Sequence, residues 1–216
     1  MSEQSSPRQF HEAEGVEDWR VLFSGACAHF RTGSFTAGVA LVDAIGRLAG
    51  AAGRPPDVDL RPSGVTVCLP PVGFGGQREG DVEFARQISA AAHELGLSAD
   101  PAGVQAVQIS IDALVTEKVL PFWRAVLGYE QVGDEDLLDP RRRGPALWFQ
   151  QMAAPRPQRN RLHVDISVPH DQAEARVAAA IAAGGRLVSD RNAPAWWALA
   201  DAEGNEVDVA TWMGRE

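Results

Sequence analysis

The sequence predicts an α+β protein built from two domains, and three observations lead to that prediction. The first half alternates strand-like and helix-like patterns, the second half contains a repeated strand-helix-strand unit, and residues near 98–103 break the chain between them. Asp100-Pro101 followed by Gly103 does not readily continue a helix. We therefore expect a frayed, polar and acidic tail at 1–18, a first domain at 19–97, a linker at 98–103 and a second domain at 104–216.

The first domain is expected to be an antiparallel sheet with helices on one face. Residues 19–31 alternate loosely and favour a hairpin that turns near Ser24-Gly25. Helical spacing at 35–53 and 81–96 predicts two helices. The stretch GRPPDVDLRP at 53–62 is interpreted as a connection that leads into the following strand, GVTVCLPP.

The first of these helices carries its own start and stop signals. Ser34 is suited to an N-cap, and Gly53 to a C-terminal stop. The apolar residues at helical spacing predict which side of the helix is buried. They are Phe35, Val39, Val42, Ile45 and Leu48–Ala49.

The second domain contains the repeat. Residues 107–132 and 162–188 share one outline, a strand, a helix that ends before a glycine, and another strand. Gln108 aligns with His163, and the strands that follow each copy place Gln150 opposite Asp208. Two such units closing on each other would form a curved sheet with a cup between them.

Composition excludes several classes of protein. The net charge of −9 argues against a general nucleic-acid binder, and no run approaches the roughly 18 consecutive apolar residues of a membrane span. The start of the chain has no apolar segment of the secretory kind, so we expect a cytoplasmic protein. Cys27 and Cys68 lack metal-binding spacing and are expected to be reduced packing residues.

Two families resemble parts of this chain. The repeat, with LPFWRAVLGYE, NRLHVDISV and DAEGNEVDVATW, resembles the glyoxalase-like branch of the vicinal-oxygen-chelate superfamily over about 104–216. That resemblance implies two paired βαβββ modules around a small-molecule cup. FSGACAHFRTGSFTAG, PPDVDLRPSGVTVCL and GGQREGDVEFARQIS resemble pterin-4a-carbinolamine dehydratase over about 19–97.

The dehydratase resemblance lacks its catalytic histidines. The family has two adjacent histidines before Pro-Asp and a third after the next strand, where this chain has Arg54, Pro55 and Val72. Arginine stays protonated, and the other two side chains do not titrate, so acid-base dehydration is not expected. Arg54 either binds an anion in the vacated cleft or faces solvent.

The superfamily resemblance implies a divalent metal held by Gln108, Gln150, His163 and Asp208. His163 and Asp208 are ordinary ligands for Fe, Mn, Ni or Zn, whereas the amides are weaker donors. If the domain is an enzyme, His163 and Asp208 are the catalytic candidates, with Asp208 as metal ligand or general base. The competing interpretation makes His163 a polar strand residue hydrogen-bonded across the cup.

Aromatic residues suggest a pocket for a flat or apolar ligand. Trp148 shares strand parity with Gln150, and Trp212 with Asp208, while one of Trp196 or Trp197 is expected to join them. Trp123, on a helix, is expected to be core. A group of arginines either attracts an anionic ligand or is simply solvated; they are Arg141, Arg142, Arg143, Arg156, Arg159 and Arg161.

These features predict a glyoxalase-like protein that binds a small aromatic or anionic molecule, with no nucleic-acid or membrane partner. Three functions stay open: a metal-assisted lyase, isomerase or dioxygenase, a ligand-sequestering or sensing protein without turnover, and a residual dehydratase. Exposed sheet edges in both folds make a homodimer plausible.

Overall fold

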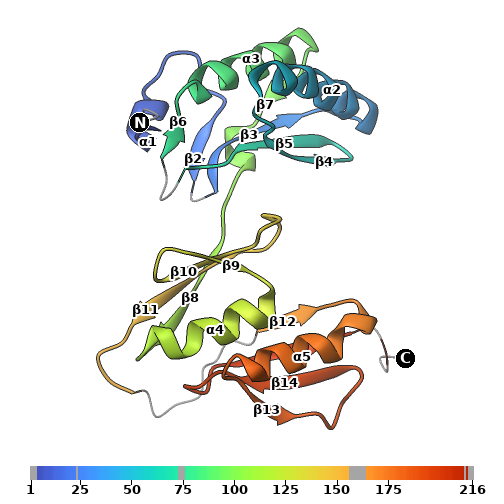
Figure 1. Ribbon diagram of the computed structural model, residues 1–216. Helices are drawn as coiled ribbons and strands as arrows, with labels where there is room; N and C mark the ends of the chain where they lie inside the picture. Colours follow the sequence, from blue (N-terminus) through green and yellow to red (C-terminus); the bar gives the residue numbers. More distant parts are fainter. Residues whose placement is uncertain (1–3, 23, 73–75, 156–163, 212, 214–216) are drawn as a thin grey trace. The chain divides into compact units, whose positions relative to one another are not determined.

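The computed structural model describes residues 4–22, 24–72, 76–155, 164–211 and 213. The chain divides into two compact units, Met1–Ala106 and Val107–Glu216 (Figure 1).

The first unit is an antiparallel sheet in the order β2-β3-β5-β4, with β7 also paired to β3. The two long helices α2 and α3 pack together on one face of this sheet (Figure 1). Its elements are β1 (Gln4–Ser5), α1 (Pro7–His11), β2 (Arg20–Leu22), β3 (Gly25–Arg31), α2 (Phe35–Ala52), β4 (Asp57–Arg61), β5 (Gly64–Leu69), β6 (Gln77–Arg78), α3 (Asp81–Glu94), β7 (Ser98–Ala99) and the 3-10 turn η1 (Pro101–Gly103).

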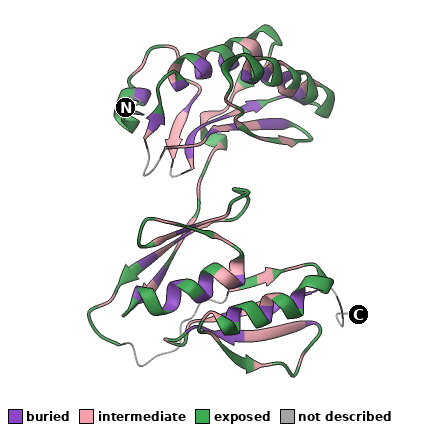
Figure 2. Cartoon of the chain, viewed as in Figure 1, coloured by how far each residue is buried: buried purple, intermediate pink, exposed green. Residues whose placement is uncertain are grey.

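Alternation along the strands builds the core of this unit. Ala28 and Phe30 of β3 are fully buried among the helices, whereas His29 between them points to the opposite face. The sequence expectation of a sheet covered by helices on one face is confirmed. Figure 2 shows the same change from buried to exposed positions along α2 and α3.

The buried side of α2 agrees in part with the one expected. Ile45 and Ala49 are buried, and Val42 and Leu48 pack against the core, as expected. Phe35 and Val39 are instead 55% and 46% exposed, and Leu41 is buried. Ser34 and Gly53 cap the helix, so its ends were predicted correctly. By length and composition alone, α2 is long and apolar enough to cross a membrane, although its buried residues pack on the sheet.

Three stretches expected to be irregular contain regular structure. Residues of the supposed tail form β1 and α1, and Phe10 and Val16 are buried in the core. The stretch at 53–62 contains β4, which pairs antiparallel with β5. The supposed linker contains β7 and η1, and β7 pairs with β3. β1, β4 and β7 are each ordered by pairing with another strand, whereas α1 begins with a local capping box at Ser6 and Gln9.

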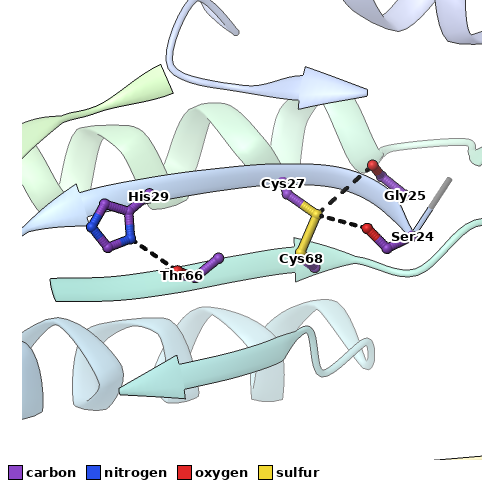
Figure 3. Close-up of a disulfide and its surroundings, with 6 residues drawn as sticks. All are labelled: Ser24, Gly25, Cys27, His29, Thr66 and Cys68. Atoms are coloured by element: carbon purple, nitrogen blue, oxygen red, sulfur yellow. Dashed lines mark hydrogen bonds between the residues drawn. A yellow bond between two sulfur atoms is a disulfide. The ribbon is translucent and has the colours of Figure 1, made fainter. Parts of the chain in front are cut away.

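The two cysteines form a disulfide, contrary to the expectation of reduced thiols. Cys27 and Cys68 are direct partners in the β3–β5 ladder, on the face of the sheet that carries no long helix (Figure 3). The expectation failed because a separation of 41 residues gives no sign that strand register places the two side chains together.

The second unit repeats one βαβββ module, as expected. The sheets run β8-β11-β10-β9 and β12-β15-β14-β13, and in each the first pair is parallel and the others antiparallel. The elements are β8 (Gln108–Ala113), α4 (Thr116–Leu127), β9 (Glu130–Val132), β10 (Asp136–Leu138), β11 (Ala146–Gln151), β12 (Val164–Ser167), the 3-10 turn η2 (His170–Gln172), α5 (Ala173–Ala182), β13 (Arg186–Ser189), β14 (Trp196–Ala200) and β15 (Glu206–Ala210).

The two modules share one apolar core through α4 and α5. Trp123 of α4 is 2% exposed, and its indole nitrogen donates to Asp201 of the second module at 2.9 Å. This confirms Trp123 as a core residue. The Glu203 carboxylate accepts the backbone N–H groups of Leu114 and Val115, both at 2.7 Å, and so caps α4 from the β14–β15 turn.

Candidate functional site

The face of the first sheet that lies away from α4 is polar. In β8 and β11, Ile111, Leu147 and Phe149 are buried in the core, and the residues between them project to the other side. That second set makes up what we call the polar face. It comprises Gln108, Ser110 and Asp112 of β8, Ala146, Trp148 and Gln150 of β11, and Asp136 of β10.

Trp148 lies at the centre of the polar face and is half-buried. It is the direct partner of Ser110 on one side and of Asp136 on the other. Its indole nitrogen donates to a Glu135 carboxylate oxygen at 3.3 Å. The Gln108 amide approaches an Asp136 carboxylate oxygen at 3.5 Å. An aromatic plane is thus surrounded by oxygen acceptors.

Asp136 is electrostatically unusual within this group. Burial, followed by the nearby Glu135 carboxylate, raises the pKa of Asp136 above its ordinary value. Both causes disfavour the ionised form. Asp136 therefore keeps its proton to a higher pH than an exposed aspartate.

The second sheet has its own polar face. Asp208 of β15 is half-buried and directly opposite Asp165 of β12 and Ala198 of β14. Trp196 has the same parity as Ala198, so it projects to this face, whereas Trp197 packs against the core. Of the two candidates, Trp196 therefore stays the predicted pocket residue, and Trp197 does not share its face.

Strand register changes the expected correspondence between the modules. With Gln108 aligned to His163, Ser110 aligns with Asp165, and their neighbours on the fourth strands are Trp148 and Asp208. The counterpart of Asp208 is thus Trp148, where the sequence predicted Gln150. The sequence alignment was wrong by two residues on β11, because the loop before β11 and the loop before β15 differ in length.

The same register tests the expected metal ligands. Gln108 lies opposite Ala146, while Gln150 lies four residues further along β11, roughly 13 Å along the strand at 3.3 Å per residue. The two amides are therefore too far apart to bind one ion. Trp148 also supplies no ligand at the position where Asp208 supplies a carboxylate. Among the described residues, the donor set does not fit the four-ligand metal that the superfamily resemblance implies.

Several expected residues lie outside the described residues. They are His163, Trp212, Arg156, Arg159 and Arg161. Arg141, Arg142 and Arg143 are described, and all three are exposed in the turn between β10 and β11.

Arg54 in the first unit is bound internally. Its guanidinium lies 3.1 Å from the Asp81 carboxylate and donates to the Glu79 carbonyl oxygen at 2.7 Å. It also covers the Phe84 ring, 5.8 Å from the centroid. Asp81 is 4% exposed and also accepts the Arg78 backbone N–H at 2.7 Å. The Arg54 charge is thus already compensated within the fold.

Comparison with known proteins now identifies both units. A "Putative pterin-4-alpha-carbinolamine dehydratase" of Nocardia farcinica (strain IFM 10152) is 42% identical over 75 residues, which is 35% of this chain and 79% of that protein. The chain belongs to the pterin-4-alpha-carbinolamine dehydratase family. The similarity covers its N-terminal part. The family model described as "Glyoxalase-like domain" matches residues 108–210, so the second unit is a glyoxalase-like domain.

Solved structures resemble the chain at low identity. A glyoxalase-related enzyme from Fulvimarina pelagi shares 17% identity with a TM-score of 0.40, covering 50% of this chain and 87% of its own. A glyoxalase/bleomycin resistance protein from Albidiferax ferrireducens T118 also shares 17% identity with a TM-score of 0.40, covering 49% of this chain and 96% of its own.

In the dehydratase-family domain, the structure accounts for the residues at the family's histidine positions. Arg54 forms an ion pair with a buried aspartate, and Pro55 carries no titratable group. Val72 makes an isolated bridge with Gly76. The sequence-based choice between an anion-binding and a solvent-facing Arg54 omitted this third arrangement.

In the glyoxalase-like domain, sequence reasoning missed Glu135 and Asp136. The signal was the short polar segment GDED before Leu137, which gives no strand pattern of its own. Pairing of β10 with Trp148 on β11 would have identified Asp136, because partners in a ladder share a face.

Proposed function

We propose that the glyoxalase-like domain binds a small flat organic molecule on the polar face of its first sheet. The observation that carries this proposal is the half-buried Trp148 at the centre of that face. The indole plane can stack on the ring of the ligand, and the hydrogen-bond acceptors around it can orient the polar edge of that ligand.

The neighbours of Trp148 give this site its selectivity. Gln108 offers an amide, and Glu135 and Asp136 offer carboxylate oxygens. These groups accept hydrogen bonds from ring N–H or amino groups. A purely apolar molecule would leave the acceptors unpaired and would bind less tightly.

Nuclear magnetic resonance of indole-labelled protein tests the proposal. Aromatic fragments that bind should shift the Trp148 indole signal, which is assigned from its loss in Trp148→Phe. Trp148→Ala should weaken fragment binding about tenfold, because stacking depends on a large plane. Phe35→Ala, at an exposed aromatic residue of α2 in the other unit, is the control and should bind normally. Binding that persists unchanged in Trp148→Ala would contradict the proposal.

A metal-assisted enzyme of lyase, isomerase or dioxygenase type is the second candidate. The observation in its favour is the direct pairing of Asp165 and Asp208 on the second sheet. Elemental analysis of protein purified without chelator tests it. A stoichiometric transition metal lost in both Asp208→Asn and His163→Ala would support this candidate, and protein that binds fragments without metal would reject it.

We infer that the dehydratase-family domain is not a catalyst. Arg54, Pro55 and Val72 supply no group that both donates and accepts a proton near neutral pH. An assay for quinonoid dihydropterin formation should give no turnover. Turnover that disappears in Arg54→Ala would overturn this inference.

We also propose that the protein is located in the cytoplasm and forms a homodimer. Cell fractionation and sedimentation of the full chain measure these two properties directly.

A further inference from the structure

A basic turn lies at one end of the polar face. Arg141, Arg142 and Arg143 are consecutive and exposed in the turn that joins β10 to β11, in a chain whose net charge is −9. Ala146, the first residue of β11, follows three residues after Arg143 and lies opposite Gln108. The turn is therefore directly continuous with the end of the polar face that Gln108 occupies.

The backbone of this turn is held in place. The Asp139 carboxylate accepts the N–H groups of Arg141, Arg143 and Gly144 at 2.9, 2.8 and 2.9 Å. Arg142 adopts a positive φ of 52° within the turn. Tyr129 fills the space beside Gly144 at the end of this turn, since a Cβ added to Gly144 would lie 2.0 Å from the Tyr129 hydroxyl oxygen. The arginine side chains thus extend from an ordered backbone, which lowers the entropy cost of using them.

The opposite charge accumulates further along the same strand. Trp148 lies two residues beyond Ala146, with Asp136 and Glu135 beside it, and Gln150 lies two residues further. Each two-residue step along a strand spans roughly 7 Å. Asp136 is level with Trp148, and its carboxylate reaches back to Gln108 at 3.5 Å, whereas Glu135 is level with Phe149. The order along β11 is therefore basic turn, aromatic plane with Asp136 beside it, then Glu135 and Gln150.

We propose that the polar face selects a flat aromatic molecule with N–H donors at one end and an anionic group at the end that meets the basic turn. The inference rests on the proposed function, because both place the ring on Trp148. An anion at the ring itself would meet the Glu135 and Asp136 carboxylates and be repelled. Near the arginine turn it gains a guanidinium fork, which matches carboxylate and phosphate oxygens.

Three matched probes test the charge at each end of the ligand. 4′-Aminobiphenyl-4-carboxylate carries both groups on one rigid frame, biphenyl-4-carboxylate lacks the amine, and 4-aminobiphenyl lacks the carboxylate. Calorimetry or the Trp148 indole signal gives the dissociation constant of each. The two-ended probe should bind about tenfold more tightly than either single-ended probe. Its phosphonate analogue then shows which anion the turn prefers.

Protein variants assign the effect to the turn. The double variant Arg141→Gln/Arg143→Gln should weaken the two-ended probe about tenfold and leave 4-aminobiphenyl unchanged. Arg186→Gln, an exposed arginine on β13 of the other sheet, is the matched control and should change neither. Asp136→Asn should weaken the two amine-bearing probes and spare biphenyl-4-carboxylate.

The possible failures are distinguishable. Equal affinity of the two-ended probe for wild type and the arginine double variant, with binding still dependent on Trp148, overturns this inference and leaves the proposed function intact. Binding independent of Trp148, or no binding of any probe at millimolar concentration, overturns both.

Discussion

The Arg54–Asp81 ion pair gives the sharpest test of the dehydratase-family domain. Asp81 is 4% exposed, and burial raises its pKa above the ordinary value of 3.8 despite the Arg78 backbone bond and Arg54, which both lower it. A raised pKa in the folded state means that ionisation of Asp81 opposes folding. Arg54 therefore neutralises the Asp81 charge, but ionised Asp81 still lowers the stability of the fold. Substitution of the two partners is expected to have different effects.

Removing the cation should be the damaging change. Arg54→Met leaves the Asp81 carboxylate buried without its cation and loses the bond to the Glu79 carbonyl. Loss of one partner of a fully buried pair costs about 3–5 kcal/mol. Because the Arg54 side chain is 24% exposed, we expect about 2 kcal/mol.

Removing the anion should be nearly neutral. Asp81→Asn resembles the protonated aspartate and can still accept the Arg78 N–H, so we expect a change within about 1 kcal/mol. Arg54→Met/Asp81→Asn should recover about 1 kcal/mol or more of the loss in Arg54→Met, because the buried charge is gone.

Urea unfolding across pH supplies the measurement. A carboxyl whose folded pKa is raised contributes stability that is fully present below its unfolded pKa and is lost as pH rises through its folded pKa. Stability of wild type relative to Asp81→Asn should therefore fall as pH rises from about 3.8. Full stability of Arg54→Met at pH 7, with an unchanged pH profile, would refute the buried-pair argument and restore Arg54 as a free anion site.

Three further predictions concern other contacts. The Cys27–Cys68 disulfide closes a loop of 41 residues, so its reduction should lower the free energy of unfolding by up to about 4 kcal/mol through chain entropy. Two titratable thiols in denatured, unreduced protein would contradict the bond. Glu203→Gln loses one of two acceptor oxygens at the start of α4 and should lower the free energy of unfolding by about 1–2 kcal/mol, measured by urea unfolding. The side-chain carboxyl carbon signal of Asp136, assigned from its loss in Asp136→Asn, should titrate with a midpoint above 3.8. A midpoint at or below 3.8 would contradict the raised pKa.

Local patterns predicted the elements better than their orientation. The ends of α2 follow from Ser34 and Gly53, which act on neighbouring backbone groups. Its buried side follows only in part: Ile45 is buried as expected, but near the start of the helix the apolar positions Phe35 and Val39 compete with Leu41. Packing against the β-sheet selects between them, and that sheet is assembled from distant parts of the chain.

The candidate site was predicted in part for a similar reason. Strand parity correctly placed Trp148 on one face together with Gln150. Parity repeats every two residues, so it cannot distinguish Trp148 from Gln150 as the counterpart of Asp208. Only the pairing of β11 with β8 sets that register, and it also brings in Asp136 from β10.

By itself, the sequence determined the α+β class, the repeated βαβββ module and the two family resemblances. It also showed that Arg54, Pro55 and Val72 stand where the dehydratase family has histidines. These depend on residue identity and short-range periodicity. The tertiary structure decided the Cys27–Cys68 bond, the ion pair of Arg54 with the buried Asp81, and the acceptors around Trp148. Each joins residues from separate elements, and strand register and packing, which no local pattern encodes, bring their side chains together.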